Sequence, residues 1–108
     1  MFLFHFTTVE AAKAISSQIV WIFEAHQPPD PQAHPAGAYF TTLHEKTPNL
    51  AKRLRIPRSK IEYYFRFLDA GDLKPLPGGR GAYILYSEGD YLVPPLRQRG
   101  HGRRPEPT

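Results

Sequence analysis

Residues 2–6 read FLFHF, a short aromatic stretch that Thr7 and Thr8 follow. A run of this length and composition is typical of a buried β-strand. Because side chains alternate across a strand, its three phenylalanines share one face, while His5 shares the other with Leu3 and Thr7. We expect the phenylalanine face to form the core, which leaves His5 on a face able to meet a ligand. The alternative is a histidine satisfied by a neighbouring backbone carbonyl.

After the aromatic stretch, Thr7 and Glu10 have the T-x-x-E spacing of a capping box, which predicts a helix over about residues 8–17. Thr47-Pro48 provides an N-cap followed by proline at the first helical position, so a second short helix is expected over about residues 48–54. Further strands are expected at 19–23, 37–41, 61–68, 82–86 and 91–93. Residues 24–36 contain four prolines and are expected to form a loop over the surface.

These elements indicate an α+β protein with about six short strands in a split or mixed sheet and two short helices. A chain of 108 residues forms one domain. We place that domain at residues 1–94, where Pro94-Pro95 closes it. Residues 95–108 are rich in Gly, Pro and Arg, and we predict that this basic tail is disordered.

Composition excludes several classes of protein. The chain has no Cys, so it has no disulfide framework and no thiolate chemistry, which fits a reducing compartment. No apolar run approaches the roughly 20 residues of a membrane helix. The first residues lack a basic region and a small-residue cleavage site, so no signal peptide is expected. The five His residues include no HExxH motif or close pair, and no metal site is predicted.

The formal net charge of +4 is unevenly distributed. Residues 52–60 (KRLRIPRSK) contain five basic residues and no acid. Such a cluster is a candidate contact for phosphate groups, nucleic acid or an acidic protein, through Lys52, Arg53, Arg55 and Arg58. The alternative is a solvated helix face.

A second motif, GAYFT at residues 37–41, places Tyr39 and Thr41 on one strand face and lets a backbone or ligand approach at Gly37. A tyrosine here can stack on a planar ligand, or it can be a half-buried strand residue with its hydroxyl in water. LFHFTT followed by a helix, and GAYFT after a loop, resemble the ADP-ribosyltransferase fold. More narrowly, they resemble the His–Tyr–Asp class of small bacterial toxins within the poly(ADP-ribose) polymerase-like group.

This resemblance covers about residues 2–93 and implies that NAD is the substrate. It implies that His5 binds the nicotinamide ribose and that Tyr39 stacks on the nicotinamide ring. Thr7 and Thr41 are further candidate contacts for NAD, because each shares a strand with one of these residues. Arg80, at the tip of the turn Gly78–Gly81, is another, and no metal is implied.

The resemblance also implies an acidic residue late in the chain. GAYILY at residues 81–86 resembles a polymerase-like strand, but Ala82 stands where that strand has Glu. Asp90 comes last in chain order and is the expected third member, with Glu88 as the alternative and Asp30 as an outsider. Asp90 can also be an ordinary turn residue after Gly89.

The expected function is therefore that of an NAD-dependent mono-ADP-ribosyltransferase, acting in the cytoplasm or delivered into a target cell's cytoplasm as a toxin domain. It would cleave the nicotinamide–ribose bond through an oxocarbenium-like state and transfer ADP-ribose to a protein or nucleic acid. With water as acceptor it would be an NAD glycohydrolase. The alternatives are a nucleic-acid-binding module that uses residues 52–60, and an inactive relative, which Ala82 favours.

Overall fold

The aromatic strand β1 (Phe2–Thr7) lies inside the main sheet, with a strand on each side. We describe residues 1–26, 35–76 and 83–105 from a computed structural model. β1 runs antiparallel to β4 (Tyr63–Leu68) along its whole length, from Phe2 opposite Leu68 to Thr7 opposite Tyr63. On its other side it pairs antiparallel with β3 (Ala38–Thr41).

Three further strands complete this sheet: β5 (Lys74–Pro75), β6 (Ile84–Ser87) and β8 (Gln98–Arg103). The order is β5-β6-β3-β1-β4-β8, and each neighbouring pair is antiparallel. β2 (Trp21–Phe23) and β7 (Tyr91–Val93) form a separate antiparallel pair. The α+β class is thus confirmed. The described residues contain eight strands instead of six, and the sheet is antiparallel instead of mixed.

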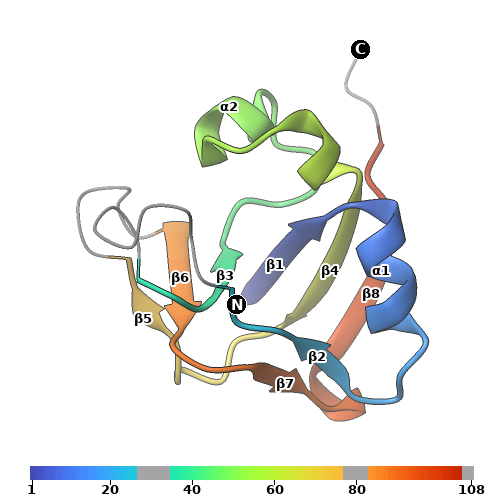
Figure 1. The fold of residues 1–108 in the computed structure, drawn as a ribbon, viewed down its shortest axis with the longest axis vertical. Helices are drawn as coiled ribbons and strands as arrows, with labels where there is room; N and C mark the ends of the chain where they lie inside the picture. The colour runs from blue at the N-terminus through green and yellow to red at the C-terminus, as the bar shows by residue number, and fades with distance from the viewer. Residues whose placement is uncertain (27–34, 77–82, 106–108) are drawn as a thin grey trace.

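Both faces of the sheet are covered (Figure 1). Helix α1 (Val9–Ser16) and the β2–β7 pair pack on one face, in a core that includes Leu3 and Phe65. Helix α2 (Leu50–Leu54) and a 3₁₀ turn at Arg58–Ile61 pack on the other face. The expectation that only the phenylalanine face of β1 is core is therefore wrong. Leu3 is 0% exposed, whereas Phe2 is 45% exposed at the end of the strand.

Helix α1 begins one residue later than the predicted capping box. Thr8 is the N-cap, and its hydroxyl accepts a hydrogen bond from the Ala11 amide at 3.1 Å. Thr7 remains in β1 because its backbone pairs with Tyr63 of β4. Ala12 is buried against the sheet, and packing of this kind stabilises a helix too short to form alone. Among the described residues, no helix is long and apolar enough to cross a membrane.

Helix α2 also differs from its prediction at its start. Asn49 is the N-cap, in the left-handed region with φ of 56°, and its side chain forms no cap hydrogen bond. Thr47 is buried, and its carbonyl accepts a hydrogen bond from the Arg104 guanidinium. Leu50 and Leu54 are buried together, as their i, i+4 spacing predicts.

The prediction of a disordered tail is wrong for residues 95–103. Pro95–Arg97 form a 3₁₀ turn, after which β8 pairs with β4 at the edge of the sheet. The Gln98 side-chain amide donates hydrogen bonds to the carbonyls of Ile19 and Val93, at 2.7 and 3.0 Å. An edge strand can form from backbone hydrogen bonds and a few side-chain contacts, without an apolar pattern in its sequence. The Gly- and Arg-rich sequence of β8 therefore does not predict a strand. Residues 106–108 lie outside the described part of the chain.

Candidate functional site

A cavity of about 240 Å³ lies between β1, α1 and β2. Its polar lining comes from His5, Thr7, Gln18, Glu24 and His26. The remaining lining is apolar and includes Ile15, Ile22 and Phe23. Apolar walls with a few convergent polar groups are typical of small-molecule sites.

The imidazole of His5 is held in a defined orientation. Its Nδ1 lies 2.9 Å from the carbonyl oxygen of Tyr39, and its ring packs against Phe23 and Phe40, with centroids 4.6 and 5.6 Å away. A carbonyl can only accept, so Nδ1 carries the proton and Nε2 is left as an acceptor. Burial is the main reason that the pKa of His5 falls from 6.5 to about 4; the bond to Tyr39 opposes this fall, and nearby His26 adds to it. His5 is therefore neutral at pH 7.

The lowered pKa predicts a pH dependence of stability. Between pH 6.5 and about 4, the unfolded chain binds a proton at His5 that the folded chain does not. The contribution of His5 is fully present above pH 6.5 and is lost as the pH falls towards 4. Between pH 7 and pH 4.5, the free energy of unfolding of the wild type should therefore fall by about 2 kcal/mol more than that of His5→Asn. Urea denaturation at the two pH values measures both proteins. Equal losses in the two proteins would contradict this assignment of the His5 pKa.

The segment that carries Glu24 and His26 is fixed by three hydrogen bonds. The Ala25 amide donates to Oδ1 of Asp90 at 2.8 Å. His26 and Gly37 exchange two backbone hydrogen bonds of 3.0 Å each. A Cβ at position 37 would lie 2.3 Å from the carbonyl oxygen of Ser87, so this close approach requires glycine.

The sequence does not predict Glu24 and His26 as site residues, because four prolines indicate a surface loop over the whole of residues 24–36. Residues 27–34 lie outside the described part of the chain. The sequence signal that could have identified Glu24 is its position: it is an acidic residue directly after the strand expected at 19–23, and side chains at the end of a strand often line a site.

The side chains of Tyr39 and His5 are on opposite faces of the sheet. The Tyr39 ring packs in the α2-side core, with its centroid 5.9 Å from that of Tyr86, and its hydroxyl donates to the carbonyl of Pro35. Tyr39 therefore reaches His5 through its backbone carbonyl. Thr41, two residues later, is buried, and its hydroxyl accepts a hydrogen bond from the Leu43 amide. Of the NAD contacts expected from the sequence, the cavity lining contains His5 and Thr7.

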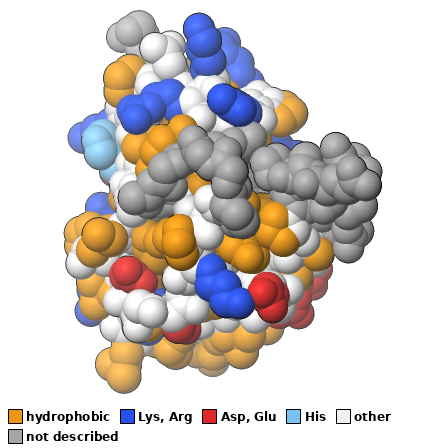
Figure 2. All heavy atoms as spheres, turned by 90° about the vertical axis from the view of Figure 1, so that its left-hand side faces the viewer, with side chains coloured by type: hydrophobic (Ala, Val, Ile, Leu, Met, Phe, Trp, Pro, Cys, Tyr) orange, Lys and Arg blue, Asp and Glu red, His pale blue; other side chains and the backbone are white. Residues whose placement is uncertain are grey.

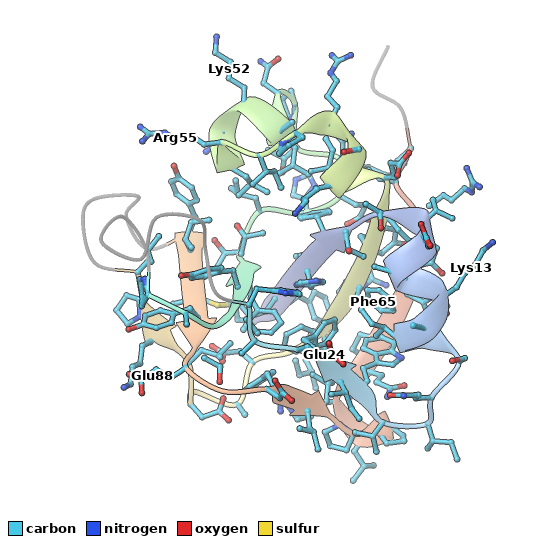
Figure 3. The ribbon with its side chains drawn as sticks, viewed as in Figure 1. Lys13, Glu24, Lys52, Arg55, Phe65 and Glu88 are labelled. Carbon is cyan, nitrogen blue, oxygen red and sulfur yellow. The ribbon has the colours of Figure 1, made fainter. Side chains whose placement is uncertain are left out.

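The two late acids occupy different places. Asp90 reaches the cavity segment through Ala25, although it does not line the cavity. Glu88 forms an exposed ion pair of 2.8 Å with Lys74, which lowers the pKa of the Glu88 carboxyl. Figure 3 shows Glu88 well apart from Glu24. The structure therefore does not gather His5, Tyr39 and a late acid in one cleft. Arg80, Ala82 and Asp30 lie outside the described residues.

The basic segment 52–60 lies away from the cavity. Helix α2 belongs to the core on the opposite face of the sheet, and basic side chains gather around it at the top of the molecule (Figure 2). Lys52 and Arg55 project outward in Figure 3. Arg53 lies over the ring of Tyr83, 5.8 Å from its centroid, and Arg58 opens the 3₁₀ turn after α2. This surface can meet a partner, but it does not line the site around His5.

Comparison with protein-family models, curated proteins and solved structures finds no match. In the described part of the chain, no three His, Asp or Glu side chains form a group that could hold a metal ion. The cavity and its neutral, oriented histidine are therefore the features of the described residues that point to a function.

Proposed function

We propose that this protein is an NAD-dependent mono-ADP-ribosyltransferase whose cavity over His5 receives the nicotinamide riboside end of NAD. The observation that carries the proposal is His5 itself. Its Nδ1 is bound to a carbonyl, and its neutral ring lines an apolar-walled cavity and offers Nε2 as an acceptor. A ribose hydroxyl is a donor that matches this acceptor.

The dimensions suit one end of a dinucleotide. At about 240 Å³ the cavity lies just under the roughly 300–1,000 Å³ of pockets for drug-sized ligands. The flat nicotinamide ring would lie against Phe23 and Ile22, and the pyrophosphate and adenosine would extend out of the cavity.

The reaction breaks the bond between the ribose carbon and the nicotinamide nitrogen, and the electron pair leaves with nicotinamide. The ribose carbon becomes oxocarbenium-like, as in glycoside hydrolysis. His5 orients the ribose by accepting its hydroxyl hydrogen. A nucleophilic group of a macromolecular acceptor then forms the new bond and loses its proton, and water in its place gives free ADP-ribose.

NAD labelled in the nicotinamide ring tests the proposal directly. We expect purified protein to release labelled nicotinamide in proportion to enzyme concentration. A second label in the adenosine half then distinguishes transfer to a macromolecule from hydrolysis. Protein that neither binds NAD in a calorimetric titration nor releases nicotinamide would exclude the proposal.

A further inference from the structure

Glu24 is the one carboxylate among the described residues that line the cavity. It follows β2 directly (Figure 3). It lines the same cavity as His5. Across the described ranges, the only ion pair joins Lys74 to Glu88, so none of the described basic side chains forms an ion pair with the Glu24 carboxylate. A negative charge is therefore available where a bound ligand would develop positive charge.

The placement of Glu24 depends on Asp90. Oδ1 of Asp90 accepts the Ala25 amide at 2.8 Å, and the next residue, His26, is bonded on both backbone sides to Gly37. These contacts fix the backbone immediately after Glu24. A hydrogen bond from an amide to a carboxylate is charge-assisted and is stronger than one between neutral groups.

We propose that Glu24 is the catalytic carboxylate of this cavity and that Asp90 is a positioning residue which holds the segment carrying it. This inference rests on the proposed function, because it names the group that acts on NAD at the same site. It also reassigns the acidic role that the sequence gives to Asp90.

In this role Glu24 stabilises the developing positive charge and accepts the proton that the reaction releases. As the ribose–nicotinamide bond breaks, its electron pair leaves on nicotinamide and positive charge spreads over the ribose carbon and ring oxygen. The Glu24 carboxylate stabilises that charge from the cavity rim. The acceptor's nucleophilic atom bonds to the ribose carbon and passes its proton to Glu24, which returns it to water.

Four variants separate the two acids. Glu24→Gln keeps the shape of the side chain but removes its charge, so the kcat of nicotinamide release should fall at least about tenfold with little change in the Kd for NAD. The effect is moderate because Glu24 is exposed and solvent screens its charge. Asp90→Asn keeps an oxygen that can accept the Ala25 amide and should retain most activity, whereas Asp90→Ala should lose it. Glu62→Gln, an exposed acid outside the cavity, is the matched control.

The outcomes are distinguishable. If the wild type releases nicotinamide and Glu24→Gln releases it at the same rate, this inference is overturned and the proposed function is left intact. The same holds if Asp90→Asn loses as much kcat as Asp90→Ala, because the charge of Asp90 would then be the catalytic group. Wild-type protein that neither binds nor cleaves NAD overturns both proposals.

Discussion

His5→Asn is expected to lower the rate of nicotinamide release about 1,000-fold, the upper end of what removal of one transition-state hydrogen-bonding group costs. The asparagine amide nitrogen occupies nearly the position of Nδ1, so it can still donate to the Tyr39 carbonyl. It has no counterpart of Nε2, the acceptor that we propose binds the ribose hydroxyl. The substitution thus separates the structural contact of His5 from its proposed contact with the ribose.

The control for this variant is His44→Asn. His44 is exposed and its Nδ1 accepts a hydrogen bond from the Lys46 amide, so the same chemical change occurs far from the cavity lining. Release of labelled nicotinamide and the melting temperature are measured for both variants. An active His5→Asn protein would show that His5 acts only by supporting β3.

Phe65→Ala is expected to lower the free energy of unfolding by about 3–5 kcal/mol, as found for buried Phe truncations. Phe65 lies on β4 (Figure 3) and is 0% exposed. Its ring centroid lies 5.0 Å from that of Trp21, 5.6 Å from that of Phe23 and 5.6 Å from that of His101. It therefore joins the main sheet, including its edge strand β8, to the β2–β7 pair. Small domains are stable by only about 5–15 kcal/mol, so the loss is a large fraction of the total.

Phe2→Ala provides the matched comparison. Phe2 lies on the same sheet but is 45% exposed, beneath the Arg66 guanidinium 5.3 Å from its ring centroid. The Phe2→Ala substitution should lower the free energy of unfolding by less than about 1.5 kcal/mol, because much of the Phe2 ring already contacts water. Urea denaturation measures both variants. Equal losses would contradict the placement of Phe65 at the junction of these elements.

The sequence predicts the strands with strong local signals and misses those without them. The aromatic runs of β1 and β4 and the GAYFT motif mark their strands within one or two residues, because each has a dense apolar pattern. β5 and β8 have no such pattern. Lys74-Pro75 is two exposed residues, and β8 depends on backbone bonds to β4, a contact between residues far apart in the chain.

For the site, the sequence identifies His5 and Thr7 but not the side chains that meet them. Alternation along β1 correctly separates His5 from its neighbouring phenylalanines. It does not show that antiparallel pairing directs the Tyr39 side chain to the other face of the sheet while its carbonyl meets His5. Glu24 enters the cavity only because β2 packs against α1 and β1, which is a property of the tertiary structure.

The most direct test is an experimental structure of the protein with NAD or nicotinamide bound. We expect the nicotinamide end to lie in the cavity between β1, α1 and β2. A ribose hydroxyl should lie within hydrogen-bond distance of His5 Nε2, and the Glu24 carboxylate should face the ribose carbon. A ligand seated instead against the Tyr39 and Tyr86 rings, on the opposite face of the sheet, would contradict this placement.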